Sequence, residues 1–265
     1  MSSAARPEVA VIGGSGFYSF LNDAEDVSVE TPYGAPSAAV AIGQVAGRPV
    51  AFLPRHGRGH ELPPHVINYR ANMWALRSLG VRRILAPCVV GGLRDEVSPG
   101  DIVVPDQLVD RTYRRIQTYV DRGAAHVPFA DPYCSDLAAA LTTSQPGLKS
   151  GGTMVVVEGP RFSTRAESQH YAAQGWTLVN MTGHPEAVLA RELSMCYLSL
   201  ALVTDMDAGV SAGEAVNQEQ VFAAFAENTE RLKGILERVI VDLPPRSDCG
   251  CATWADGIDL PFEVP

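Results

Sequence analysis

Short apolar runs alternate with amphipathic stretches along the chain, and this pattern limits the fold more than any other feature. The runs 9–12, 84–90 and 197–204 have the length and apolar content of buried strands. The stretches 68–79 and 217–241 carry apolar side chains at helical spacing. Strands that alternate with helices in this way predict an α/β fold.

The pattern continues up to residue 243, which predicts a single domain over residues 1–243. A chain of 265 residues is long enough for such a domain to bury a substantial core. Residues 244–265 are rich in Pro, Gly and Asp, so we expect an irregular C-terminal tail there.

The composition argues against several classes of protein. The chain is 46% hydrophobic and 19% charged, as is typical of a globular protein. No uninterrupted apolar run reaches the roughly 18 residues of a membrane-spanning helix, and the N-terminus lacks the regions of a secretory signal. We therefore expect a soluble, cytoplasmic protein without a membrane partner. A net charge of −9, without clusters of Lys and Arg, argues against nucleic acid binding.

The five cysteines are an odd number, and their spacing does not indicate a disulfide framework. Cys88 and Cys196 lie in apolar runs and are predicted to be buried small hydrophobic residues. Cys249-Gly250-Cys251 could form a redox pair or part of a metal site, but no His/Cys set with zinc spacing accompanies it. We therefore expect a plain or occasionally oxidised surface tail, and no metal site.

Two carboxylates, Asp205 and Asp207, stand one residue apart at the end of an apolar strand. Alternate residues of a strand share a face, so both side chains are predicted to point the same way. Two like charges that close raise at least one pKa if they are partly dehydrated. The pair could then offer a proton donor and an acceptor to the edge of a nitrogen heterocycle. Two ordinary solvated acids are the other interpretation, and for the pair alone it is the better one.

Three further segments at strand ends could hold an anion. The loop 13–16, Gly-Gly-Ser-Gly, could bind a phosphate oxygen through backbone N–H groups and a hydroxyl, or it could be a tight turn. Arg55 and His56 open a loop with two Arg and two His, which could bind an oxyanion or be an exposed basic loop. Thr182 precedes a predicted helix, where a hydroxyl and the helix N-terminus favour an anion, or where it could be an N-cap.

Apolar residues beside these segments could line a ligand site. Phe162 could stack on a flat ligand, or it could staple the following helix, whose capping box pairs Thr164 with Glu167. Met181 could line a sugar face, or it could be a core residue.

Taken together, the motifs stand in the order in which one known family has them. They are Gly13 to Gly16, Arg55 to Arg58, Asn68 to Leu76, Pro99 to Val103, Glu158 to Ser163, Asn180 to Thr182 and Thr204 to Asp207. The chain thus resembles the 5′-methylthioadenosine phosphorylases, within the trimeric purine nucleoside phosphorylase superfamily. The resemblance runs from about Val9 to Val241.

The resemblance implies a fold, an assembly and a reaction. The fold would be a central mixed, partly barrel-like sheet surrounded by helices, and the assembly a homotrimer with active sites near the subunit boundaries. The reaction would be the reversible phosphorolysis of 5′-methylthioadenosine to adenine and 5-methylthioribose 1-phosphate, a pentosyl transfer in purine and methionine salvage. Nucleoside and phosphate would be the only partners, and no cofactor is needed because positioning and electrostatics can supply the rate.

Site residues carry over by the same resemblance. The phosphate site would comprise Ser15, Arg55, His56, Cys88, Val89 and Thr182. The nucleoside site would comprise Asp205 and Asp207 at the purine, Phe162 beside the base, Met181 under the ribose and His126, which would reach a neighbouring subunit's 5′ pocket. Substrate choice would depend on Ser163, Gln218 and Val221. The catalytic residues would be Asp205, as acid toward N7, Asp207, as acceptor from the 6-amino group, and His56.

Two residues depart from the family pattern. Cys88 offers only a weak S–H donor where relatives have a Thr hydroxyl, so we expect weaker phosphate affinity, although the Val89 N–H could still bind the anion. Gln218 is more polar than the apolar residue expected beside a methylthio group, which leaves selectivity at the 5′ position open.

Three other functions remain as alternatives. The same fold could act on 6-oxopurines such as inosine or methylthioinosine, although a 6-oxo group would oppose an acceptor to the Asp207 carboxylate. The chain could bind purines without catalysis, with Cys88 as a sign of decay. A dinucleotide-dependent oxidoreductase is remote, because the glycine spacing at 13–16 does not fit.

Overall fold

The computed structural model describes residues 6–14, 20–21, 24–208, 216–245 and 249–265. The strands are β1 (Val9–Gly13), β2 (Glu25–Val27), β3 (Val40–Val45), β4 (Arg48–Pro54), β5 (Arg83–Gly92), β6 (Ile102–Val104), β7 (Gln107–Arg111), β8 (Lys149–Ser150), β9 (Thr153–Val157), β10 (Leu178–Asn180) and β11 (Cys196–Met206). The helices are η1 (Pro64–Val66), α1 (Tyr69–Ser78), α2 (Ser135–Ser144), α3 (Arg165–Ala173), α4 (Gly183–Glu192), α5 (Gln218–Asp242) and α6 (Gly250–Thr253).

The strands form one mixed sheet that branches at β5. Its main path runs β2-β3-β4-β1-β5-β10-β9-β7, while β11 pairs with both β5 and β6. β1, β4, β5 and β11 are parallel to their neighbours in this central part, and β10 pairs antiparallel with β5. The pairings between the described strands do not close the sheet into a barrel.

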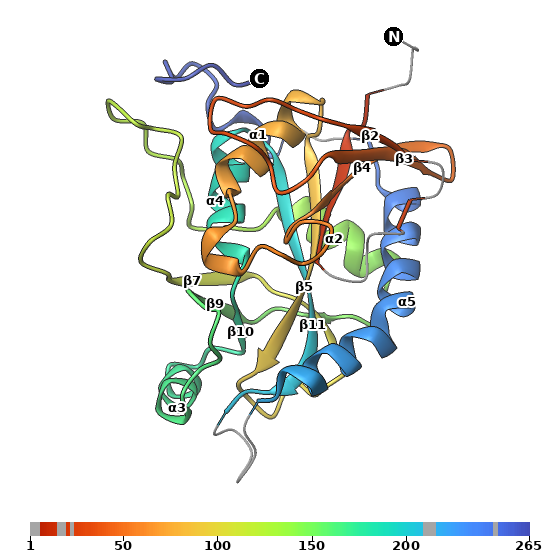
Figure 1. Ribbon diagram of the computed structural model, residues 1–265, viewed down its shortest axis with the longest axis vertical. Helices are drawn as coiled ribbons and strands as arrows, with labels where there is room; N and C mark the ends of the chain where they lie inside the picture. The colour runs from red at the N-terminus through yellow and green to blue at the C-terminus, as the bar shows by residue number, and fades with distance from the viewer. Residues whose placement is uncertain (1–5, 15–19, 22–23, 209–215, 246–248) are drawn as a thin grey trace.

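Helices cover both sides of the long central strands (Figure 1). α1 and α4 pack together on one side, and α2 and α5 pack together on the other, with α4 and α5 both contacting β11. β11 is accordingly buried along nearly its whole length. One large apolar cluster fills this centre, and a smaller one lies around Tyr171 of α3.

The edge of β5 opposite β11 is left partly unpaired by the described strands where the sheet branches. β1 pairs with β5 only at 83–85, and β10 joins the same edge only at 91–92. Between these two pairings, among the described strands, residues 86–90 of β5 have a sheet neighbour on the β11 side alone. A crevice at such a switch point, beyond the carboxyl ends of strands, is where open α/β sheets bind ligands.

The α/β fold with a mixed sheet surrounded by helices is confirmed, as is the capping box, in which Thr164 and Glu167 satisfy each other's backbone N–H groups. The predicted irregular tail contains α6, in which Cys251 is buried, and Trp254 directly after it is buried too. Apolar contacts far along the chain, which local periodicity does not report, hold this segment.

Candidate active site

A cavity of about 360 Å³ lies at the crevice beside β5. It brings together most of the residues that the sequence singled out: Arg55, His56, Cys88, Val89, Phe162, Ser163, Met181, Thr182, Asp205, Asp207, Gln218 and Val221. Ser15 lies outside the described residues. His126 is exposed in the loop between β7 and α2 and does not line the cavity, so its contact with a neighbouring subunit stays a prediction.

The acid pair is set by an irregularity at the end of β11. The pairing of β11 with β5 shifts register between Val203 and Asp205, so that Asp205 lies opposite Gly91. A Cβ at Gly91 would lie 3.1 Å from Asp207 Cβ and 3.3 Å from Asp205 Oδ1. Both carboxylates therefore lie on the same side of β5, as predicted, and glycine leaves the room for them.

The environments of the two carboxylates differ. Asp205 accepts a hydrogen bond from Thr204 Oγ1 at 2.8 Å through Oδ2, while its buried Oδ1 has no partner among the described residues. Burial raises the pKa of Asp205 to about 6, the Thr204 hydrogen bond opposes this, and the charge of Asp207 adds to it. Asp207 is buried and accepts a hydrogen bond from Ser168 Oγ at 2.5 Å. The carboxyl of Asp205 thus titrates close to neutral pH, whereas the carboxylate of Asp207 is held in place by a hydroxyl from α3.

Arg55 lies in the cavity wall, but most of its guanidinium is already bonded. Nε and Nη2 donate to the two carboxylate oxygens of Glu186 at 2.6 and 3.0 Å, and Nη1 and Nη2 donate to the carbonyls of Pro87 and Ile12. Tyr197 donates a further hydrogen bond to Glu186. Burial alone would lower the pKa of Arg55, but the charge and hydrogen bonds of Glu186 outweigh it and the pKa is raised. Of the five N–H donors of a guanidinium, one remains for a ligand, so the prediction that Arg55 binds phosphate depends on that group.

His56 is uncharged near neutral pH. Burial and then the charge of Arg55 lower its pKa to about 4, while a hydrogen bond to the Leu62 carbonyl opposes the shift. Because a carbonyl only accepts, Nδ1 at 2.8 Å from Leu62 O carries the proton, and Nε2 is left as an acceptor. The ring stacks on His60, with centroids 4.5 Å apart.

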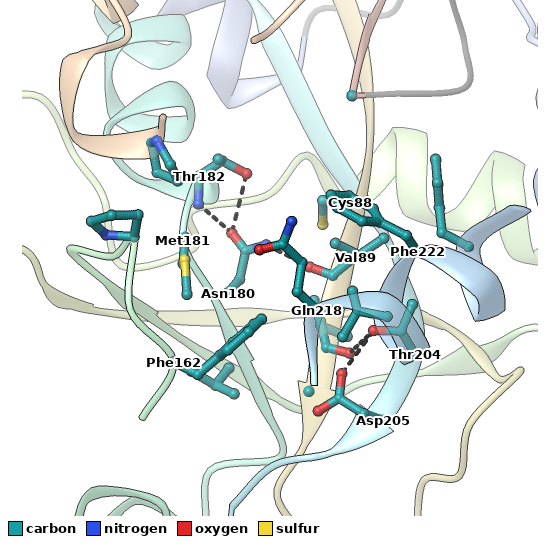
Figure 2. A pocket seen from close by; sticks show the side chains of 18 of the residues that line it. Cys88, Val89, Phe162, Asn180, Met181, Thr182, Thr204, Asp205, Gln218 and Phe222 are labelled. Atoms are coloured by element: carbon teal, nitrogen blue, oxygen red, sulfur yellow. Dashed lines mark hydrogen bonds between the residues drawn. The ribbon is translucent and has the colours of Figure 1, made fainter. Parts of the chain in front are cut away.

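Asn180, at the end of β10, organises the wall around Thr182 (Figure 2). Its Oδ1 accepts from the backbone N–H groups of Thr182 and Gly183, both at 2.7 Å, and its Nδ2 donates to the Val89 carbonyl. The Thr182 side chain does not cap α4; its hydroxyl donates a long hydrogen bond of 3.4 Å to Asn180 Oδ1 and lines the cavity. Cys88 faces the cavity from β5, and burial raises the pKa of its thiol to about 12, so that it is a neutral, weak donor.

Apolar and amphipathic side chains line the rest of the cavity (Figure 2). Met181 lies between Thr182 and Phe162 in this view, with Asp205 at the other end of the cavity from Thr182. Phe162 is 37% exposed, as a face for stacking requires. Gln218, Val221 and other residues of α5 border the opening.

Several lining or supporting residues were not found from the sequence. They are His60, Ser168, Asn180, Glu186 and Phe222. His60 lies in the loop that Arg55 and His56 open, and Asn180 begins the motif Asn180 to Thr182, so a sequence signal existed for both. Ser168, Glu186 and Phe222 lie inside helices, where nothing local distinguishes them.

Residues 8–241 match the sequence family described as the phosphorylase superfamily. The chain belongs to the phosphorylase superfamily. This match covers nearly the same span as the resemblance found in the motifs. An S-methyl-5′-thioadenosine phosphorylase of Mycolicibacterium smegmatis is 58% identical, over 97% of this chain and 99% of its own. A purine nucleoside phosphorylase of Streptomyces coelicolor is 54% identical over all of both chains.

Solved structures of the superfamily share the fold. The crystal structure of a methylthioadenosine phosphorylase from an Antarctic soil metagenomic library superposes with a TM-score of 0.88, at 38% identity, over 94% of this chain and 91% of its own. As a separate finding, no helix in the described part of this phosphorylase is long and apolar enough to cross a membrane.

Proposed function

We propose that this phosphorylase cleaves 5′-methylthioadenosine with inorganic phosphate to adenine and 5-methylthioribose 1-phosphate. The observation that carries the proposal is the pair of unequal carboxyls in the cavity. Asp205 has a raised pKa and an unpartnered Oδ1, whereas Asp207 is fixed by Ser168. Such a pair can give a proton at one ring position and accept a hydrogen bond at the next.

In the proposed reaction the N9–C1′ bond breaks as the phosphate oxygen bonds to C1′. Asp205, when protonated, donates toward N7 of the leaving adenine, and Asp207 accepts from the 6-amino group. Phe162 stacks on the base and Met181 lies under the ribose. The phosphate is held at the Thr182 end by Ser15, Thr182, the remaining Arg55 N–H and the Cys88–Val89 segment. His56 contributes through Nε2, which accepts a hydrogen bond from a protonated phosphate oxygen. No cofactor takes part.

The reaction on 6-oxopurines is the second candidate, because one relative with 54% identity is named a purine nucleoside phosphorylase. A 6-oxo group and the Asp207 carboxylate are both acceptors, and unpaired acceptors in a buried site discriminate strongly between substrates. Adenine nucleosides are therefore the expected substrates. Exposed Gln218 at the opening leaves room for 5′ groups more polar than methylthio.

The proposed assembly is a homotrimer in which His126 of one subunit completes the 5′ pocket of the next. We propose that it works in the cytoplasm, in purine and methionine salvage. Light scattering of the purified protein at several concentrations tests the trimer. A His126→Ala variant that turns over 5′-methylthioadenosine with unchanged KM would contradict its part in the 5′ pocket.

A panel of nucleosides, each with and without phosphate, tests the reaction. We expect phosphate-dependent release of adenine from 5′-methylthioadenosine, with kcat/KM well above that for inosine and methylthioinosine. Faster turnover of inosine would favour the 6-oxopurine reaction. Tight binding of adenine with no phosphate-dependent release would show a binding protein in place of an enzyme.

A further inference from the structure

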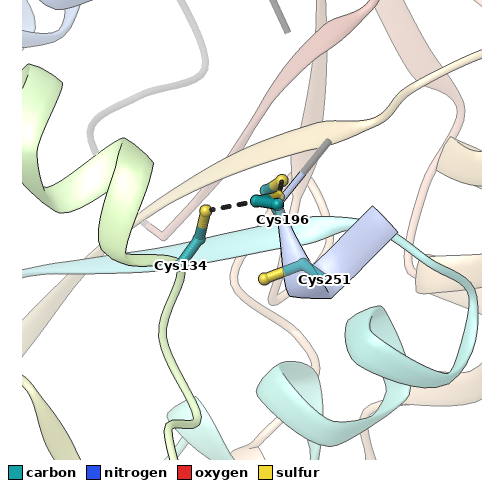
Figure 3. Close-up of side chains that lie close together, drawn as sticks. Cys134, Cys196 and Cys251 are labelled. Carbon is teal, nitrogen blue, oxygen red and sulfur yellow. Dashed lines mark hydrogen bonds between the residues drawn. The ribbon is translucent and has the colours of Figure 1, made fainter. Parts of the chain in front are cut away.

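Four of the five cysteines converge at a place apart from the cavity (Figure 3). They are Cys134, Cys196, Cys249 and Cys251, and their sulfur atoms all lie within 4.8 Å of one another. Cys249 Sγ lies 3.3 Å from Cys196 Sγ and 4.0 Å from Cys134 Sγ. The sequence had suggested that Cys249 and Cys251 lack partners, but the fold supplies two from residues far along the chain.

These distances suit a tetrahedral metal site. Zinc–sulfur bonds of about 2.3 Å place the four sulfurs of a tetrahedron about 3.8 Å apart. The two sulfur–sulfur distances of 3.3 and 4.0 Å lie on either side of that value. Three of the four side chains are buried and Cys249 is half-buried, so that the group is largely closed to solvent.

Backbone hydrogen bonds connect two of the four cysteines to neighbouring elements of the domain. Cys134 precedes α2 and its N–H donates to the carbonyl of Tyr197. Cys196 is the first residue of β11, and its N–H donates to the Arg82 carbonyl. The other two flank Gly250 at the start of α6. A helix of four residues gains little stability by itself, so α6 depends on what its side chains contact.

Positive charge lies beside the cluster. A zinc ion with four thiolates carries a net charge of −2, which calls for cationic or N–H neighbours. The charge of buried Arg191 acts on Cys251. Arg83, whose Nη2 is ion-paired with Glu8 at 3.0 Å, lines a small cavity together with Cys134 and Cys196, and its buried Nε–H has no hydrogen-bond partner among the described residues.

We propose that Cys134, Cys196, Cys249 and Cys251 bind one zinc ion, which links the C-terminal segment 249–265 to the rest of the domain. Four protein ligands leave no open position, so the site is structural and takes no part in the chemistry. Each thiol loses its proton on binding. The end of this segment lies near α1. There Arg77 donates a hydrogen bond to the Pro265 carbonyl at 2.7 Å, and Phe262 packs against Tyr119.

Disulfides are the competing chemistry for the same four thiols. In the reducing cytoplasm, which is the proposed location of this protein, such a cluster favours a metal over disulfides. The zinc proposal depends on the proposed function only through that location, and its test does not use enzyme activity.

The first test is the metal content of the full-length protein, purified without chelator. We expect one zinc per chain in the wild type and about a tenfold lower content in Cys251→Ser and in Cys249→Ser. Cys88→Ser is the matched control, since Cys88 lies in the cavity wall and is in no group of metal-binding side chains among the described residues; this variant should keep its zinc. Zinc retained by both tail variants would overturn the proposal.

A second test uses the wild type alone, in case a variant does not fold. Reduced, chelator-treated protein is titrated with Co²⁺, and the visible spectrum of a tetrahedral four-thiolate site should develop up to one equivalent. Absence of that spectrum, together with zinc-free purified protein, would overturn the proposal. Alkylation and mass spectrometry of freshly isolated protein complete the test, because cysteines already paired as disulfides would also overturn it.

Discussion

Replacing Asp205 by Asn should make the protein more stable at pH 8 and nearly inactive. The substitution keeps the shape of the side chain but removes its ionisation. Burial raises the pKa of Asp205 from 3.8 to about 6, and its Oδ1 is buried without a partner among the described residues. The folded protein therefore bears a free-energy cost when this carboxyl ionises. The same shift keeps the carboxyl protonated up to a higher pH, as the proposed acid role requires.

The magnitude follows from the two pKa values. Each pKa unit corresponds to about 1.4 kcal/mol, so ionisation of Asp205 at pH 8 costs the folded state about 3 kcal/mol. Between pH 3.8 and about 6 the folded protein keeps a proton that the unfolded chain has released. Stability therefore falls as the pH rises through this window, and the full cost is present above it. The gain in Asp205→Asn should be about 2 to 3 kcal/mol at pH 8 and less than about 1 kcal/mol at pH 4.

Denaturant unfolding of the ligand-free protein at both pH values, at one protein concentration, measures this difference. Asp95→Asn is the control, since Asp95 is exposed; it should change stability by no more than about 0.5 kcal/mol. Turnover of 5′-methylthioadenosine by Asp205→Asn should fall by about 100-fold or more. A gain of equal size at both pH values, or no gain at pH 8, would refute the electrostatic reasoning. Near-normal turnover would refute the acid role.

Three further substitutions test the rest of the cavity. Ser168→Ala removes the hydroxyl that holds Asp207, so kcat/KM for 5′-methylthioadenosine should fall about tenfold while the KM for phosphate stays the same; an unchanged kcat/KM would contradict the positioning role. Cys88→Thr should lower the KM for phosphate, because a hydroxyl donates better than a thiol, and no change would place the anion elsewhere. Glu186→Gln leaves the buried Arg55 charge without its partner, which should lower the free energy of unfolding by about 3 to 5 kcal/mol; a loss below about 1 kcal/mol would show that the pair is unimportant for stability.

The fold and the main polar segments that line the cavity could be predicted, because both depend on local sequence. Strands of 5 to 11 residues such as β1 and β11 show as apolar runs, and their ends show as polar or glycine-rich loops. The carboxyl ends of parallel strands meet at one edge, so Arg55 and the acid pair had to lie near one another. The capping box of α3 was also readable, because both partners are three residues apart.

Partners that are distant in the sequence could not be predicted. Arg55 was expected to bind an anion, but Glu186, 131 residues further on, already takes two of the hydrogen bonds of its guanidinium. Ser168 meets Asp207 across 39 residues, from inside a helix with no local signal. The cysteine cluster is the same case, because its two core members and its two tail members belong to different elements.

The charges at the two ends of the cavity suggest how the proposed reaction gains rate. At the anion end, Glu186 neutralises Arg55, His56 is uncharged near neutral pH and the Cys88 thiol is protonated. A bound phosphate there keeps most of its negative charge, because no free cation among the described lining residues cancels it. The acid pair at the other end is itself negative once Asp205 has given up its proton. A ribosyl cation that develops between the two ends is stabilised by both, whereas the neutral nucleoside is not, so the cavity favours the transition state over the bound substrate.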